Sequence, residues 1–380
     1  MMEKYSIYLP ESEGSVETEW GQCLQQIKKE KQTGRRLAKL NIFIYADNYD
    51  HYLSINESIS NSVLQAFGNE CPAFSITVHP PEKPWKVIVE AGYMNQADFL
   101  IETKKYQSLP YVVRSNGNKK ELLVFGIGTG QFPDDTYRAG NEVFEQMKAI
   151  LEKEGMSFNN LVRQWNFIGG ILSINNDIQN YQAFNELRNE KYSKYRKVSG
   201  YPAATGIGMK MDGVKVDFYA VKSENPEAVI PIENPDQINP YSYEQKVLKG
   251  NILQGKSGKQ PPQFERAVLS GNNLFISGTA SIIGQDTIGL GDVEKQTAVT
   301  LENILKLYNS NKIPRSDGDT SRNAMELIIL RAYIRYQEDF EKVKAVCEKY
   351  FPGAPVVYIE ADICRDDLLV EIEAEYIKSK

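Results

Sequence analysis

Residues 361–374 read ADICRDDLLVEIEA, and their second half has the alternation of a β-strand with acids on one face. Successive side chains of a strand point to opposite faces, with a period of two residues. In residues 368–377 one face carries Val370, Ile372, Ala374 and Tyr376, and the other carries Leu369, Glu371, Glu373 and Glu375. The first face is typical of a core. The acids are either solvated on an open sheet or part of a site, and the strand alone leaves both interpretations open.

The composition predicts a globular protein of more than one unit, without a nucleic-acid or membrane partner. Of the 380 residues, 41% are hydrophobic and 25% are charged. At ~100–200 residues per domain, this length indicates two domains or one duplicated unit. The net charge of -6 gives no basic footprint for nucleic acid. No segment approaches the ~18 apolar residues of a membrane helix, and the first residues lack the order of a signal peptide, so we expect a cytoplasmic protein.

Cysteine and histidine are too scattered to predict a metal centre or a disulfide framework. The cysteines form no CxxC pair, and the chain has only two histidines; these residues are Cys23, Cys71, Cys347, Cys364, His51 and His79. We therefore predict no metal ion and no other cofactor.

A weak internal repeat predicts two units of the same fold. Residues 122–130 (LLVFGIGTG) resemble residues 274–282 (LFISGTASI), because each is an apolar strand that breaks into small residues. A helix pattern follows each strand, at about residues 141–153 and 292–308, with Asp292 as the N-cap of the second. The last strands of the two halves also correspond. In that alignment Asp217 matches Glu371.

We therefore predict an α+β fold of two units, each an antiparallel or mixed sheet with helices packed on one face. The first unit, with an N-terminal extension, covers residues 1–240. A linker covers residues 241–261, in a stretch rich in Pro, Asn, Gln and Gly, and the second unit covers residues 262–380. Residues 1–110 have strand and helix patterns but no functional interpretation.

Three ordered blocks resemble the reactive-intermediate deaminase (YjgF-like) superfamily, whose units have a chorismate-mutase-like fold. They are FISGTASI at residues 275–282, GDVEKQTAVTLENI at 291–304 and LVEIEA at 369–374. Upstream blocks resemble the chorismatases, enzymes with two YjgF-like halves that act on chorismate. These are VRQWNFIGGI at 162–171, YQAFNELR at 181–188, YPAATGIG at 201–208 and PQFERA at 262–267. The resemblance spans about residue 161 to residue 380, and it implies an enzyme that converts chorismate.

The resemblance implies that Glu371 is the catalytic acid/base and that arginines hold the substrate, which is a dicarboxylate. Arg163 and Arg331 lie within apolar strands that correspond in the two halves. A buried arginine needs a partner, which is either a substrate carboxylate or an internal salt bridge. The other candidates for substrate binding are Arg188, Tyr201, Thr205, Gly206, Arg266 and Gly278.

The implied chemistry is protonation of the terminal methylene carbon of the enolpyruvyl ether, followed by release of pyruvate. A carboxylic acid can donate this proton only if it stays protonated near neutral pH. Burial raises the pKa of a carboxyl, whereas a nearby arginine lowers it. We therefore expect Glu371 to be desolvated and not paired directly with an arginine.

The product and the assembly are less defined by the sequence. Gly278 and Cys364 resemble the subtype that forms 3-hydroxybenzoate, which implies a catalytic role for Cys364, and a dihydroxycyclohexadiene carboxylate is the other product type. An imine or enamine deaminase is an alternative function, although Val356 occupies the place where those proteins have an arginine. A non-catalytic metabolite-binding protein also stays open. YjgF-like units commonly form trimers, so we expect a monomer or a homotrimer.

Overall fold

The structure, a computed structural model, describes residues 2–30, 34–97, 99–129, 132, 135–175, 177–223, 229–252, 255–316 and 319–379. Gly130, which belongs to the repeat at residues 122–130, lies outside the described residues. Among the described residues, no helix is long and apolar enough to span a membrane.

One order of elements, β-α-β-α-β-β, occurs three times along the chain. Unit 1 consists of β1 (Lys4–Tyr8), α1 (Val16–Lys29), β2 (Arg35–Ile44), α2 (Tyr49–Phe67), β3 (Ala73–Val78) and β4 (Val87–Asn95). Unit 2 consists of β7 (Lys119–Thr129), α3 (Thr136–Lys153), β8 (Leu161–Gly169), α4 (Asn180–Tyr195), β11 (Ala203–Met209) and β12 (Val214–Ser223). Unit 3 consists of β15 (Asn273–Ala280), α5 (Val293–Tyr308), β20 (Met325–Ile334), α6 (Phe340–Tyr350), β21 (Val356–Glu360) and β22 (Val370–Lys378).

Further strands widen two of the sheets or form small hairpins. β5 (Leu100–Tyr106) and β6 (Leu109–Ser115) extend the sheet of unit 2, and β13 (Val229–Ile232) and β14 (Ala267–Ser270) extend that of unit 3. The hairpins are β9 (Ile174–Asn175) with β10 (Ile178–Gln179), β16 (Ile282–Ile283) with β17 (Asp286–Thr287), and β18 (Arg315–Ser316) with β19 (Asp319–Asn323).

The sheet topology confirms the α+β class and corrects the predicted division of the chain. Both predicted units are present, and residues 4–95 form a third unit of the same order, where the sequence indicated only an extension. The predicted boundary at residue 240 also differs, because β13 pairs with β14 and therefore belongs to the sheet of unit 3. Asp292 caps α5 as predicted, since its side chain accepts a hydrogen bond from the backbone N–H of Lys295 at 3.0 Å.

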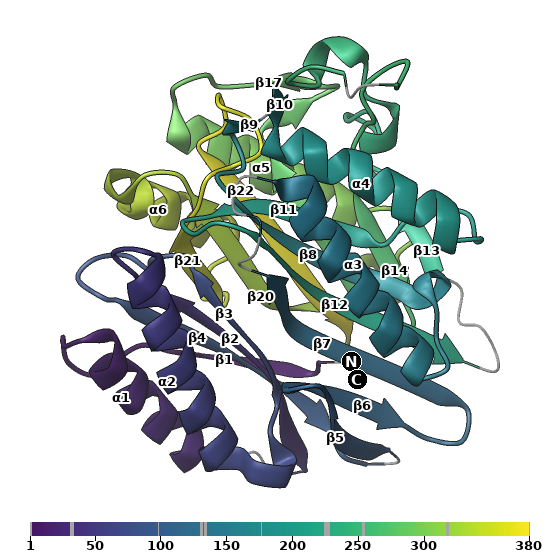
Figure 1. The fold of residues 1–380 in the computed structure, drawn as a ribbon. Coiled ribbons are helices and arrows are strands. Elements are labelled where there is room, and N and C mark those ends of the chain that lie inside the picture. The colour runs from purple at the N-terminus through teal and green to yellow at the C-terminus, as the bar shows by residue number, and fades with distance from the viewer. Residues whose placement is uncertain are drawn as a thin grey trace.

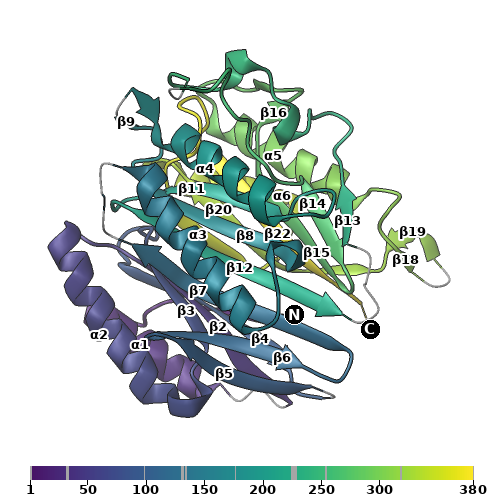
Figure 2. The same ribbon diagram turned by 45° about the vertical axis from the view of Figure 1, so that its right-hand side comes forward.

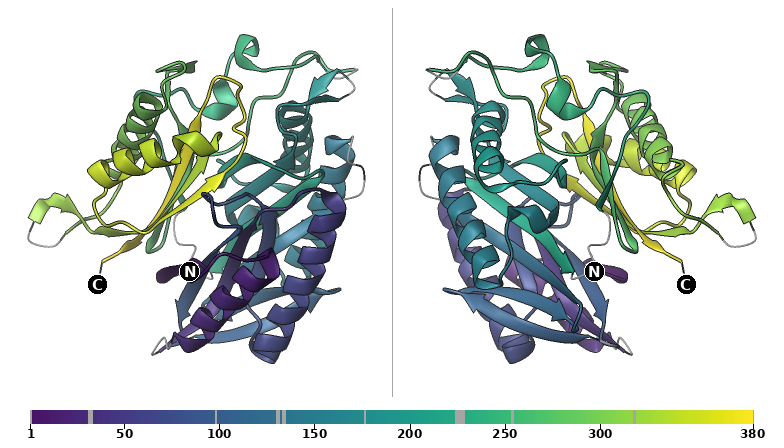
Figure 3. Two further views of the ribbon diagram at one scale, coloured as in Figure 1. Left: turned by 90° about the vertical axis from the view of Figure 1, so that its left-hand side faces the viewer. Right: turned by 90° about the vertical axis from the view of Figure 1, so that its right-hand side faces the viewer.

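The three sheets face one another, and each carries its two helices on the outer side (Figures 1, 2 and 3). Each pair of helices covers its own apolar cluster, formed with the outer face of the adjacent sheet. A fourth cluster combines the inner faces of all three sheets and includes Phe43, Trp165 and Tyr333. Both faces of every sheet are therefore buried over much of their area, and the acidic face of β22 lies inside the molecule instead of in solvent.

A one-residue bulge in each unit fixes which positions correspond. The extra residue is Ala38 in β2, Val162 in β8 and Ile328 in β20. The residue three positions after each bulge pairs with Glu90 in unit 1, with Asp217 in unit 2 and with Glu373 in unit 3. These three acidic residues therefore occupy the same position of the three units. A second bulge, at residues 125–126 of β7 and 277–278 of β15, gives the same match of Asp217 with Glu373. The expected match of Asp217 with Glu371 is therefore wrong by two residues.

The three units meet around His79. The residues five positions beyond the bulges are Phe43, Phe167 and Tyr333, and their rings lie 6.1, 5.3 and 6.3 Å from the His79 ring. The imidazole is fully buried, with Nδ1 beside the Thr77 hydroxyl and Nε2 beside the Gly208 carbonyl oxygen. Burial lowers the pKa of His79 to about 3, so the ring is a neutral part of the core.

A buried network of ion pairs joins the inner faces of the three sheets. Arg331 of unit 3 binds Glu90 of unit 1 with two of its nitrogens, and its Nη1 donates to Glu373 at 2.7 Å and to Glu375 at 2.9 Å. Arg163 of unit 2 donates to Glu373 at 2.6 Å, and Lys39 Nζ lies 2.9 Å from Glu90 Oε1. These three cations and three carboxylates balance in charge, and each is at most 2% exposed.

We expect Arg331→Met to destabilise the protein by about 3–5 kcal/mol, because three buried carboxylates would lose a guanidinium partner. Equilibrium urea unfolding of wild type and variant measures this change. Lys148→Met is the matched control, since it removes an exposed pair with Glu152 and should leave the free energy of unfolding nearly unchanged. A similar, small change in both variants would contradict a structural role for the network.

Candidate active site

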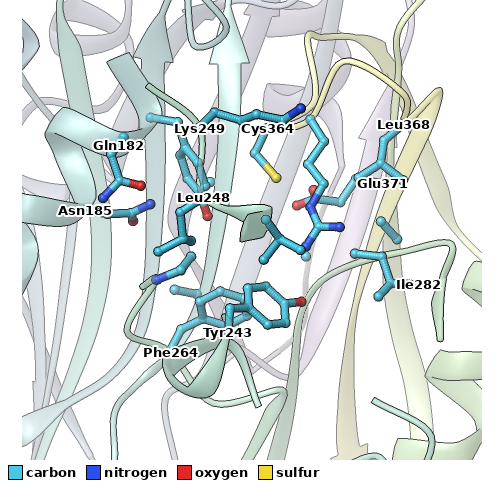
Figure 4. Close-up of a pocket in the computed structure, with 18 of the residues that line it drawn as sticks. Gln182, Asn185, Tyr243, Leu248, Lys249, Phe264, Ile282, Cys364, Leu368 and Glu371 are labelled. Atoms are coloured by element: carbon cyan, nitrogen blue, oxygen red, sulfur yellow. The ribbon is translucent and has the colours of Figure 1, made fainter. Parts of the chain in front are cut away.

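The described cavity that contains Glu371 lies at the junction of units 2 and 3 (Figure 4). Unit 2 contributes the first turns of α4 and strand β11 to its walls. Unit 3 contributes the neighbouring strands β15 and β22 and the loop before β22. Residues 243–249 cover one side. The lining includes Gln179, Tyr181, Gln182, Asn185, Arg188, Gly206, Tyr243, Leu248, Lys249, Phe264, Arg266, Gly278, Cys364, Arg365 and Glu371.

Glu371 is an isolated carboxyl in this cavity. It lies on β22 between Ala280 of β15 and Tyr333 of β20, and it is 5% exposed. Desolvation and the negative charge of Glu373 raise its pKa to about 8, against the opposing effect of Arg163 and Arg266. Within the described residues no arginine forms an ion pair with it. The carboxyl is therefore largely protonated at neutral pH, in the environment that we expected for this residue.

Two glycines leave room around this carboxyl. A Cβ atom at Gly278 would lie 1.9 Å from Glu371 Oε1, so any larger residue would displace the carboxyl. A Cβ at Gly206 would lie 3.1 Å from the ring of Tyr181 on the opposite wall. Both glycines line the cavity, and the close approach of backbone to a side chain explains why glycine is needed at position 278.

Arg188 and Arg266 bring two positive charges into the cavity without a carboxylate partner among the described residues. Arg188 Nη2 donates to Asn185 Oδ1 at 2.7 Å, and Arg266 Nη2 donates to the Ile238 carbonyl and to the Tyr243 hydroxyl, both at 2.7 Å. The Nε atoms of both arginines and the Asn185 side-chain nitrogen are buried and have no hydrogen-bond partner within the part of the chain that the structure describes. Buried donors of this kind require an acceptor, and an anionic ligand would supply it.

Cys364 and Glu371 lie together on the wall formed by the end of unit 3 (Figure 4). Burial and the nearby Glu371 carboxyl raise the pKa of the Cys364 thiol to about 12. The thiol therefore stays protonated at neutral pH and presents a small, weakly polar surface beside Glu371.

Four of the predicted ligand-binding residues lie outside the cavity lining. Arg331 and Arg163 belong to the buried ion network, so the internal salt bridge, and not the substrate carboxylate, is their observed partner. Thr205 lies behind the cavity wall, where its hydroxyl accepts from the Gly278 N–H at 3.0 Å and donates to Glu373. Tyr201 stacks on Tyr192 at 5.9 Å and borders a separate hollow. We therefore correct the expected direct role of these four residues.

Sequence reasoning missed most of the polar lining. Gln182 and Asn185 precede Arg188 at three-residue intervals on α4, a spacing that places all three on one helix face, and this signal was available in the sequence. Tyr243, Leu248 and Lys249 come from the predicted linker, where a polar composition indicated a connector. Arg365 also lines the cavity, and its Nη1 donates to the Gln285 carbonyl at 2.8 Å.

Comparison of the chain with known proteins identifies the family to which it belongs. A family model described as "Chorismatase FkbO/Hyg5-like, N-terminal" matches residues 112–220. The 3-hydroxybenzoate synthase of Streptomyces hygroscopicus is 32% identical over 256 residues, which are 64% of this chain and 70% of that protein. The chain belongs to the chorismatase family.

Two further relatives agree with this assignment. A chorismatase of Streptomyces hygroscopicus is 30% identical over 67% of this chain and 72% of its own length. A crystal structure of a chorismatase covers 99% of both chains with a TM-score of 0.63 at 22% identity, and this likeness shows a shared fold. The family assignment therefore rests on sequence, and the fold agrees along the whole chain, including unit 1.

The raised pKa of Glu371 makes the stability of the protein depend on pH. The folded chain holds a proton up to about pH 8 that the unfolded chain releases near pH 4.5. Wild type should therefore lose stability relative to Glu371→Gln as the pH rises between these values, by about 1.4 kcal/mol per pH unit. Urea unfolding of both proteins across this range measures the difference. Glu326→Gln, an exposed change on β20, is the control and should follow the wild-type profile. A Glu371→Gln profile that also runs parallel to that of wild type would contradict the raised pKa.

Proposed function

We propose that this chain converts chorismate to pyruvate and a hydroxybenzoate, with 3-hydroxybenzoate as the favoured product and Glu371 as the general acid. The observation that carries the proposal is one carboxyl, protonated at neutral pH, in a buried cavity with two guanidinium groups that have no carboxylate partner among the described residues. Membership of the chorismatase family and the relative named 3-hydroxybenzoate synthase support the substrate and the product.

Arg188 and Arg266 are the proposed ligands of the two substrate carboxylates. They enter the cavity from different elements, α4 and the segment before β14, so they can bind two separate anionic groups. Guanidinium groups suit this task because they donate two parallel hydrogen bonds to a carboxylate. Lys249 and Arg365 add positive charge at the same cavity. A substrate with two negative charges would therefore neutralise the guanidinium groups of Arg188 and Arg266, which have no carboxylate partner among the described residues.

The proposed first step transfers the Glu371 proton to the terminal methylene carbon of the enolpyruvyl ether. This forms a C–H bond and leaves an oxocarbenium-like centre at the ether carbon, next to the Glu371 carboxylate. A pKa near the operating pH is optimal for an acid that must both donate and recover a proton. The negative charge of Glu373, fixed behind Glu371 by Arg163 and Arg331, helps to keep that proton on the acid before the substrate is bound.

The next step decides the product. Attack of water on the oxocarbenium centre returns a proton to Glu371 and leads to pyruvate and a dihydroxycyclohexadiene carboxylate, with one water consumed. Alternatively, the ring hydroxyl of the substrate attacks the neighbouring ring carbon that bears the ether, and the bond from that carbon to the ether oxygen breaks to release pyruvate. The ring then returns one proton to Glu371 and rearranges to a hydroxybenzoate, with no net consumption of water. The thiol of Cys364, which stays protonated beside Glu371, favours the second route because it limits the space for an ordered water.

The small enclosed space favours a shift of the covering segment, residues 243–249, when substrate enters. The enclosed space is about 60 Å³, below the ~300–1,000 Å³ of typical ligand sites. Residues 243–249 are attached through short 3-10 turns and through Lys259, whose Nζ donates to the Leu248 carbonyl. An outward shift of this segment would enlarge the cavity without disturbing the sheets.

We expect Glu371→Gln to lower the turnover of chorismate by about 10²–10⁴-fold, because the amide cannot supply the proton. Pyruvate is measured by a coupled lactate dehydrogenase assay, and the ring products are separated by chromatography. Glu326→Gln should retain the wild-type rate. Wild type that binds chorismate without releasing pyruvate would instead support a binding protein, and wild type that neither binds nor converts it would exclude chorismate and direct the search to imines.

Replacement of Cys364 should change the product more than the rate of pyruvate release. In Cys364→Ser the hydroxyl can hold a water beside Glu371, so the share of the dihydroxycyclohexadiene carboxylate should rise at least about tenfold, which corresponds to about 1.4 kcal/mol between the two routes. Cys347→Ser, a buried cysteine of α6 far from the cavity, is the control. An unchanged ratio of ring products in Cys364→Ser would remove this residue from the control of product type.

A further inference from the structure

The threefold repeat of units creates a counterpart of the Glu371 cavity at the junction of units 1 and 2. Glu371 pairs across the sheet with Tyr333, five residues beyond the bulge of β20. The same position in unit 2 is Lys215, which pairs with Phe167, and in unit 1 it is Ile88, which pairs with Phe43. One strand position therefore carries an acid, a base and an apolar residue in the three units.

The strand positions around Lys215 correspond to those around Glu371, although some of them carry different residues. Gly126 and Gly128 of β7 take the places of Gly278 and Ala280, and Gly128 faces Lys215 as Ala280 faces Glu371. Ile76 of β3 takes the place of Gly206 of β11, because both strands pair in parallel with the strand that carries the bulge.

The first turns of a helix border both cavities. α4 contributes Gln182, Asn185 and Arg188 to the Glu371 cavity, and α2 contributes four residues to its counterpart. The counterpart has a volume of about 240 Å³. Its lining is Tyr49, Tyr52, Leu53, Asn56, Ile76, Thr77, Val78, Gly126, Gly128, Met209, Met211, Asp212 and Lys215.

Lys215 gives this cavity one cationic group, and the walls around it include two tyrosines and two methionines among polar and backbone surface. Its Nζ donates to the Ile76 carbonyl and lies 5.0 Å from the Tyr52 ring. In the described part of the chain no carboxylate forms an ion pair with it. The charged groups near it are Asp212, which is exposed at the rim, and Asp217, whose carboxylate accepts from the Gly126 N–H.

We propose that this cavity is a second ligand site, which binds a small aromatic monocarboxylate with its carboxylate on Lys215 and its ring against Tyr49, Tyr52 and the two methionines. One lysine is suited to one carboxylate, in contrast to the arginine pair of the Glu371 cavity. Tyrosine and methionine side chains make favourable contacts with an aromatic ring. The site lacks an acid at the position of Glu371, so it binds without turnover. The proposal is independent of the reaction at Glu371.

The test is calorimetric titration of benzoate into wild type, Lys215→Gln, Lys222→Gln and Arg188→Gln. Lys222 is the matched control, because it also lies on β12 and its Nζ also donates to a backbone carbonyl, that of Gly155. We expect the Lys215 cavity to bind benzoate with similar affinity in wild type, Lys222→Gln and Arg188→Gln, and any second equivalent held by the arginines of the Glu371 cavity to be weakened in Arg188→Gln alone. In Lys215→Gln this affinity should fall at least about tenfold, while chorismate turnover stays within about twofold of wild type.

A second variant and a second anion complete the test. Leu53→Trp fills the mouth of the cavity from an exposed position of α2, so it should abolish benzoate binding even if Lys215→Gln proves unstable. Benzoate affinity that is unchanged in both variants, or no binding to wild type, would overturn the proposal. Inorganic phosphate that binds as tightly as benzoate would overturn the aromatic class of the ligand.

Discussion

The buried ion network among the three sheets is the constraint on which the rest of the structure depends. Arg331 links Glu90 of unit 1 to Glu373 and Glu375 of its own unit, and Arg163 ties unit 2 to the same Glu373. Charges buried at this depth are tolerated only when they are paired. The three inner faces must therefore meet in one register, and that register places β15 of unit 3 against β11 of unit 2, where the Glu371 cavity forms.

Burial keeps Glu371 protonated, and the same network adds to this effect. Lys39, Arg163 and Arg331 bind Glu90, Glu373 and Glu375, and none of them forms an ion pair with Glu371. Glu371 lies two residues from Glu373 on the same strand face, so it experiences a fixed negative charge in a desolvated position. A pKa near 8 thus follows from the burial of Glu371, and the charge that the ion network fixes at Glu373 raises it further. In unit 2 the corresponding position carries Lys215. The cavity there is built from the corresponding strands and helix, but a lysine takes the place of the acid.

The sequence predicted the local structure well and the partners of its charged residues poorly. The alternation in residues 368–377 correctly separates the core face of β22 from its acidic face. It could not show that the acidic face is buried, because the compensating Arg163 lies 210 residues away and Glu90 belongs to a unit with no recognisable pattern. The sequence left two partners open for Arg163 and Arg331, and the structure selects the internal carboxylates. The sequence did not reveal unit 1 as a third copy of the fold. Its strands have the same order and the same bulge as those of the other units, but few identical residues.

The central claim is that Glu371 is a neutral carboxylic acid in the free protein at neutral pH. An infrared difference spectrum between wild type and Glu371→Gln, recorded without substrate as a function of pH, tests it directly. The account predicts the carbonyl band of a protonated carboxyl at neutral pH, replaced by carboxylate bands as the pH passes about 8. A difference spectrum with carboxylate bands alone, already present at neutral pH, would contradict the account.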